Sequence, residues 1–289
     1  MNTSPTPEKN LAAQIRSSRT PNGCLQVWPL GQMGYLIKAA DQNCILVDPV
    51  LSNVVAERVP NPALFQRAFP PPLNPGDLDF IQAVLVTHAH LDHTDPLTIG
   101  ELARVNPDLI VIGPAEARQV AVSETRLSQK QWIVPKQGEV LHCGNLKVRA
   151  IPAAHYTLEF EQDGSSRYIS YHLAWPEQTV FHSGDAIAYP GYTQNIAGLP
   201  PAQTAILAVN GRDPAREAQD IKGNFFPEEA AALAIQIGWQ TVLAGHNDLF
   251  AYNALPPERV AALPSMFPSA PPFLLPRVGE SITLPYRKP

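Results

Sequence analysis

The sequence predicts an α/β fold, and three observations support this. Short apolar runs rich in β-branched residues, such as residues 81–86, lack a helical period and are typical of buried strands. Segments with helix-forming composition alternate with such runs after residue 95 and again after residue 205. The 289 residues can bury a full core, and no linker forces a division. We therefore expect one domain over residues 1–289.

Composition excludes several classes of protein. Hydrophobic residues make up 45% and charged residues 16%, and the net charge of −5 argues against a general nucleic-acid binder. No run has the length of a membrane span, and residues 1–9 lack the apolar core of a signal peptide, so we expect a cytoplasmic protein. Cys24, Cys44 and Cys143 are odd in number and widely spaced, so we expect small buried apolar side chains and no disulfide framework.

The first third of the chain predicts a meander followed by a loop. Residues 1–20 are polar and proline-punctuated, so we expect a loose or partly helical lead-in. Residues 25–28, 31–37 and 44–49 are typical of consecutive antiparallel strands joined by short turns. Residues 51–75 are proline-rich and irregular, and they precede the strand at 81–86. A loop in this position is a candidate lining for a site.

Helices and strands then alternate. Asp95 and Pro96 predict the cap and first position of a helix through residue 105, and Pro227 with two acids predicts the start of another through residue 237. A further helix is expected over 114–122. The remaining expected strands are 109–113, 132–134, 139–141, 146–151, 168–175, 179–182, 205–209 and 241–246.

Four potential metal ligands lie within six residues after the strand at 81–86. They are His88, His90, Asp92 and His93. Histidine is a common ligand of zinc and related metals, and aspartate supplies the oxygen that such sites accept. A lone histidine is more often structural, but three with an aspartate at this spacing are hard to explain as packing. The pattern predicts a metal site.

The His-x-His-x-Asp-His motif resembles that of the metallo-β-lactamase superfamily, and the resemblance covers residues 24–285. It implies an αββα sandwich in which two mixed sheets lie between outer helices. It also implies a site for two divalent metals, one held by His88, His90 and His155, the other by Asp92, His93 and His246, with Asp185 as the bridge. The sequence itself shows only that these seven residues lie at the ends of expected strands or in the turns that follow.

This ligand set implies hydrolysis. Two bridged cations acidify a bound water, so the resemblance implies an attacking metal-bound hydroxide, with Asp92 and His155 as catalytic residues. The absence of sulfur ligands fits zinc or manganese and does not choose between them. Asp48 and His182 are candidates to orient the ligands from behind; the alternatives are a strand-capping aspartate and a structural histidine.

Within the superfamily the chain is similar to the ascorbate-6-phosphate lactonase-like branch. The similar segments are 28–31, 182–185, 210–213, 223–225 and 245–250. The resemblance implies the opening of a lactone or similar ester of a small anionic metabolite. His155 stands where those lactonases carry an acid, and with Tyr156 it resembles the phospholipase D-type phosphodiesterases. A phosphodiesterase is therefore the alternative, followed by a ribonuclease.

Two arginines are candidates for binding an anionic substrate. Arg212 and Arg216 can present forked donors, and the amides of Asn210 and Asn224 can add neutral ones. The alternative is that the arginines pair with neighbouring carboxylates such as Asp213, Glu217 and Asp220 at the surface. A homo-oligomer stays open, because no feature of the sequence bears on it.

Overall fold

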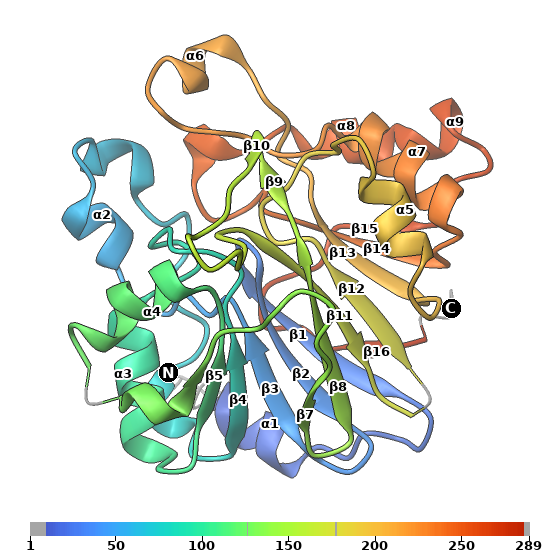
Figure 1. The fold of residues 1–289 in the computed structure, drawn as a ribbon. Coiled ribbons are helices and arrows are strands. Elements are labelled where there is room, and N and C mark those ends of the chain that lie inside the picture. Colours follow the sequence, from blue (N-terminus) through green and yellow to red (C-terminus); the bar gives the residue numbers. More distant parts are fainter. Residues whose placement is uncertain (1–9, 126, 177, 286–289) are drawn as a thin grey trace, which may run out of the picture.

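The computed structural model describes residues 10–125, 127–176 and 178–285, and two seven-stranded sheets form its centre (Figure 1). The first sheet has the order β16-β1-β2-β3-β4-β5-β6, with bounds Ile282–Leu284, Leu25–Gly31, Gly34–Ala39, Cys44–Val47, Ile81–Leu85, Ile110–Ile112 and Trp132–Ile133. The second has the order β15-β14-β13-β12-β11-β8-β7, with bounds Phe273–Leu274, Thr241–Gly245, Thr204–Ala208, Thr179–His182, Ile169–Ala174, Leu146–Pro152 and Leu141–Cys143.

Both sheets are mixed, as the resemblance implied. In the first, β16, β1, β2 and β3 pair antiparallel, and β3, β4, β5 and β6 pair parallel. In the second, β15 to β12 pair parallel, and β12, β11, β8 and β7 pair antiparallel. Parallel strands bring their carboxyl ends to the same edge of a sheet, which is where side chains that follow several strands can meet.

Three apolar clusters define four layers. Val27, Leu85, Val148 and Ile206 belong to the cluster that fills the space between the sheets. A second cluster packs α3 (Pro96–Val105) and α4 (Ala115–Val122) on the outer face of the first sheet. A third packs α5 (Tyr192–Ala197) and α7 (Pro227–Ile237) on the outer face of the second. The αββα order is therefore confirmed (Figure 1).

The two best-marked helices begin and end where the sequence predicts. Asp95 accepts hydrogen bonds from the N–H groups of Leu97 and Thr98 at the start of α3. Gly238, with φ 81°, ends α7 in the left-handed conformation that glycine adopts readily. The remaining helices are α1 (Leu11–Ser17), α2 (Val54–Arg58), α6 (Pro214–Glu217), α8 (Pro257–Ala261), α9 (Leu263–Met266), and the 3₁₀ turns η1 (Pro62–Phe65), η2 (Pro75–Asp77), η3 (Gln129–Gln131) and η4 (Ala251–Asn253).

The lead-in contains α1, which confirms the partly helical alternative; its terminal carbonyls accept hydrogen bonds from the buried Lys38 ammonium, and residues 1–9 lie outside the described residues. Other expectations need correction. The loop at 51–75 carries α2 and η1. The strand expected at 139–141 runs over Leu141–Cys143, because Glu139 closes a turn with Lys136. Only Cys44 is buried, whereas Cys24 and Cys143 are partly exposed; all three are free thiols.

Four short strands were not predicted: β9 (Ala154–His155), β10 (Thr157–Leu158), β15 and β16. Each has only two or three residues, too few to show a period in the sequence. In the described ranges, none of the helices has both the length and the apolar character needed to span a membrane.

Candidate metal centre

The His-x-His-x-Asp-His segment forms a tight turn between β4 and α3. The N–H groups of His93 and Thr94 both donate to His90 O, and the Thr94 hydroxyl donates to His88 O at 2.6 Å. These bonds fold six residues back on themselves, so their side chains project from the end of β4 toward the second sheet. The predicted strand-to-turn exit is confirmed.

The other candidate ligands follow strands of the second sheet or, for His155, belong to the two-stranded sheet formed by β9 and β10. His155 ends β9, Asp185 follows β12, and His246 follows β14. Gly184, with φ 57°, makes the turn that delivers Asp185; a Cβ there would lie 2.8 Å from the Thr87 Cβ, so the two sheets approach too closely for any other residue. His246 has φ 58°, a strained conformation of the kind that clusters at functional sites.

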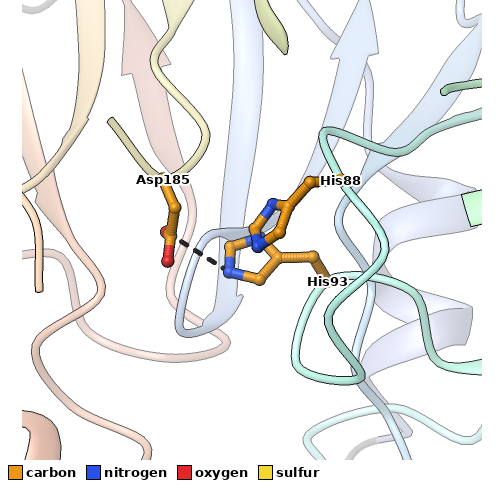
Figure 2. A group of neighbouring side chains, drawn as sticks. All are labelled: His88, His93 and Asp185. Atoms are coloured by element: carbon orange, nitrogen blue, oxygen red, sulfur yellow. Dashed lines mark ion pairs between the residues drawn. The ribbon is translucent and has the colours of Figure 1, made fainter. Parts of the chain in front are cut away.

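Four of the seven side chains form close contacts. His93 Nε2 lies 3.3 Å from Asp185 Oδ1 (Figure 2) and 3.7 Å from Asp92 Oδ2. His246 Nε2 lies 3.2 Å from Asp185 Oδ2 and 3.5 Å from Asp92 Oδ2. Two sets of ligand atoms lie within 4.8 Å of one another: His88, His93 and Asp185, and Asp92, His93 and His246. The second set matches the three residues expected to share a metal.

The other three residues expected to share a metal also lie together. The ring centroid of His88 lies 4.5 Å from that of His90 and 5.7 Å from that of His155. The centroids of His90 and His155 are 5.3 Å apart. His88 and His155 are buried, and His90 is the exposed member. The fold thus brings all seven residues to one place.

Several buried atoms of this cluster lack a hydrogen-bond partner among the described residues. His88 Nε2, His93 Nε2 and Asp185 Oδ1 are three of them. An unpaired buried polar atom is costly, and native structures seldom leave several at one point without a reason. A divalent cation would accept all three as ligands, so the residues present fit a metal site.

The pKa values divide the histidines into two kinds. Burial lowers the pKa of His155 to about 3 and that of His88 well below its usual range, so both are neutral, the form that binds metal. Burial also acts to lower the pKa of His93 and His246. There Asp185 and Asp92 outweigh it, raising the pKa of His93 well above 6.5 and that of His246 to about 9.

The two aspartates are ionised for the reciprocal reason. Burial acts to raise the pKa of Asp92 and Asp185, but His93 and His246 outweigh it and hold both values below the usual range. Two carboxylates are therefore held by two protonated imidazoles. Metal binding would replace those protons, since the ligating form of histidine is neutral.

Asp48 lies directly behind His93. Its Oδ2 is 2.8 Å from His93 Nδ1, and Thr87 donates to both carboxylate oxygens, from its N–H at 2.8 Å and its hydroxyl at 2.7 Å. With Nδ1 held, the Nε2 atom of His93 faces Asp92 and Asp185. His182 lies further back: its Nδ1 accepts from Gly184 N and its Nε2 contacts Met33 O at 3.0 Å, so it fixes the turn that carries Asp185.

Sequence reasoning missed Gln32. Its side-chain amide donates to Asp92 Oδ2 at 2.8 Å and lies 3.2 Å from His246 Nε2. It also has φ 56°, in the turn between β1 and β2. In the sequence, only Gly31 and Gly34 mark this turn, and they predict its shape. They give no sign that Gln32 contacts Asp92 and His246, which lie 60 and 214 residues further along the chain.

The residues expected to bind an anion lie in an internal network. Both terminal nitrogens of Arg212 donate to Glu229, and one also donates to Asn224 O at 2.8 Å. Arg216 is buried and donates to Asp213 Oδ2, to Asn253 Oδ1 and to Asn210 O. These contacts favour pairing with carboxylates, the alternative weighed from the sequence, although the partner of Arg212 is not one of the acids considered there.

The amides of Asn210 and Asn224 belong to the same network. The Asn224 amide donates to Asn210 Oδ1 at 3.0 Å, and the Asn210 amide donates to Asn253 Oδ1 at 2.9 Å. Both asparagines are fully buried. The network therefore supports the loop between β13 and α7 from inside.

A pocket of about 340 Å³ opens onto the metal ligands. His90, Asp92, His155, Asp185 and His246 line one end of it. Lys222, which sequence reasoning also missed as a site residue, lines the pocket as well and has no ion-pair partner within the described ranges. It is half-buried, and its loop follows α6. Val55, Val59 and Phe65 show that the proline-rich segment does line the site.

Comparison with known families and proteins gives a consistent result. A family model described as "Beta-lactamase superfamily domain" matches residues 43–247. An uncharacterized protein of Mycobacterium tuberculosis is 27% identical over 197 residues, which are 67% of this chain and 50% of that protein. The chain thus spans about half the length of these mycobacterial relatives. A probable L-ascorbate-6-phosphate lactonase of Escherichia fergusonii is 23% identical over 88% of this chain and 78% of its own.

The fold also matches solved structures. A possible metal-dependent hydrolase of Veillonella parvula superposes with a TM-score of 0.68, covering 90% of this chain and 99% of its own at 17% identity. At this identity the likeness concerns the fold. It agrees with the four-layer architecture described above.

Proposed function

The chain belongs to the beta-lactamase superfamily, and from that premise we propose that it is a binuclear metal-dependent hydrolase acting on a lactone or a similar ester of a small anionic molecule. One observation carries the proposal: buried nitrogen and oxygen atoms of His88, His93 and Asp185 that make no hydrogen bond converge within 4.8 Å of one another beside an open pocket. His93 Nε2 and Asp185 Oδ1 form an ion pair at 3.3 Å, and His88 Nε2 has no hydrogen-bond partner among the described residues.

The seven side chains would hold two divalent cations, zinc or manganese. His88, His90 and His155 would hold one, Asp92, His93 and His246 the other, and Asp185 would bridge them. A bound divalent cation lowers the pKa of a coordinated water and polarises a carbonyl or phosphoryl oxygen.

This chain's own residues supply positioning and charge. Asp48 holds His93 in one orientation through Nδ1, and Gln32 donates to the Asp92 oxygen that faces His246. Gly184 and His182 fix the turn before Asp185. We assign the anionic end of the substrate to Lys222 in place of Arg212 and Arg216, because Lys222 lines the pocket and the two guanidinium groups are already paired with Glu229 and Asp213.

The similarity to the probable lactonase of Escherichia fergusonii supports the ester version of the reaction. A phosphodiesterase is the second candidate, since His155 stands at a position where the lactonases carry an acid. A cytoplasmic location stays a prediction, and the oligomeric state stays open.

An activity panel tests the proposal. Purified protein, reconstituted with Zn²⁺ or Mn²⁺, is assayed with lactones, carboxylic esters, bis-p-nitrophenyl phosphate and glycerophosphodiesters. We expect turnover of lactones and esters that stops on chelation and returns with metal. Turnover of the phosphodiesters alone would select the second candidate, and no turnover of any class would contradict the proposal.

A further inference from the structure

Part of the pocket lining is apolar. Val55, Val59, Phe65 and Leu91 line it, and we call these four side chains the apolar wall. They belong to a small cluster with Val50, Leu249 and Phe250 that is separate from the three clusters of the main layers. Val59, Phe65 and Leu91 are only half-buried, so they retain apolar surface on the pocket side.

The apolar wall is held in place by the segment that carries it. The Phe65 ring packs edge-on against the buried Phe250, with centroids 5.5 Å apart and planes at 75°. Arg67 donates to the carbonyls of Val50 and Ser52, and Ala68 N donates to Leu249 O at 2.8 Å. The wall is thus a built surface of the pocket, because its largest ring and the residues that flank it have fixed partners.

Three polar residues line the pocket besides the candidate metal ligands. Asn253 also lines the pocket, but its amide oxygen already accepts hydrogen bonds from Asn210 and Arg216. Asp220 and Lys222 are the other polar lining residues away from the metal ligands. A polyhydroxylated substrate would place hydroxyl groups against apolar side chains, where each unpaired hydroxyl is penalised. An alkyl, acyl or aryl group would instead bury apolar area on both sides.

We infer that the substrate of this site carries an apolar chain or ring, which lies against the apolar wall while the ester group lies at the metal ligands. This inference rests on the proposed function for the position of the ester. It deepens that function by choosing an amphipathic substrate over a sugar-like one. The pocket volume of about 340 Å³ is at the small end of the range for ligand sites, so a short chain or a single ring fits it.

A binding series tests the inference without relying on turnover. Straight-chain carboxylates from butanoate to decanoate are titrated into the metal-reconstituted protein by calorimetry. We expect Kd to fall about fourfold for each added methylene until the pocket is filled, the fold-change that burial of one methylene gives. A Kd that does not change with chain length would overturn the inference.

Variants test whether the apolar wall causes the dependence of Kd on chain length. Phe65→Ala should make Kd depend less on chain length. Val59→Thr exchanges a methyl for a hydroxyl at nearly the same volume and should raise Kd for the longer carboxylates about fourfold. Val59→Thr keeps the test decisive if Phe65→Ala unfolds. Phe160→Ala is the matched control, because Phe160 is 46% exposed and does not line the pocket. An equal effect of Phe160→Ala would contradict the role of the wall.

The two claims fail in different ways. A chain-length gradient without hydrolysis of any lactone or ester would contradict the proposed function and leave the inference standing. Hydrolysis of esters with a flat binding series would do the reverse.

Discussion

His93 Nδ1 lies 2.8 Å from Asp48 Oδ2, and both side chains are fully buried. His93 lies in the turn after β4, and Asp48 lies at the end of β3, the neighbouring parallel strand. This contact between the two strand ends therefore sets the orientation of the His93 ring. Asp48 itself has φ 42°, a strained backbone that places its carboxylate under the turn.

Asp48→Asn should therefore weaken metal binding while the fold stays intact. The amide keeps the shape of the carboxylate but loses the charge that favours and orients His93, and such changes typically cost about 10- to 100-fold in metal affinity. Competition with a chromophoric chelator measures the affinity. Asp108→Asn, an exposed aspartate, is the control, and an unchanged Kd in Asp48→Asn would contradict this role.

Loss of a ligand should be more severe than loss of the residue behind it. Asp92→Ala and His246→Ala should each lower kcat/KM by more than about 100-fold. Both variants should stay folded, because neither side chain belongs to the apolar clusters, but their melting temperatures should fall below that of the apo protein because a buried ion pair is lost. His142→Ala, an exposed histidine on β7, should retain activity. Substantial turnover by either ligand variant would show that the second metal is dispensable.

Metal affinity should rise with pH up to about 9. His246 has its pKa raised to about 9 by Asp185 and Asp92 in the absence of metal, so it is protonated at neutral pH. The metal must displace that proton. Below pH 9 most of His246 is protonated, so protons compete with the metal; above pH 9 His246 is mostly neutral and this competition is lost. Calorimetry in buffers of different ionisation enthalpy counts the released protons. An affinity independent of pH between 7 and 9 would contradict the protonated state.

Substitution of Lys222 should affect substrate binding, whereas substitution of Arg212 should affect stability. Lys222→Gln should raise KM for an anionic lactone and leave KM for its neutral methyl ester unchanged, the sign of a lost charge contact. Lys147→Gln, exposed on β8, is the control.

Arg212→Ala should instead lower stability, since it frees Glu229 and removes a donor from Asn224 O. We expect a loss of about 1 kcal/mol, a fall in Tm of about 2 °C, with KM unchanged. A raised KM for the anionic substrate alone would restore Arg212 as a binding residue.

Part of the candidate metal site was predictable because its pattern is local: His88, His90, Asp92 and His93 share one turn after an apolar strand. His155, Asp185 and His246 came from the family resemblance, because no short spacing links them to that turn. Arg212 and Gln32 show the opposite case. The partner of Arg212 is Glu229 on α7, and the partner of Gln32 is Asp92, 60 residues further along the chain, so neither contact has a sequence period or spacing that marks it. The short strand β16 likewise depends on pairing with β1, at the far end of the chain.

Metal content after reconstitution tests the central claim most directly. Protein freed of metal, loaded with Zn²⁺ or Mn²⁺ and then dialysed, is analysed by inductively coupled plasma mass spectrometry, with X-ray absorption giving the distance between metals. We predict two ions per chain, about 3.5–4 Å apart. One ion per chain would contradict the binuclear site, and a metal-to-protein ratio near zero would contradict metal-dependent hydrolysis.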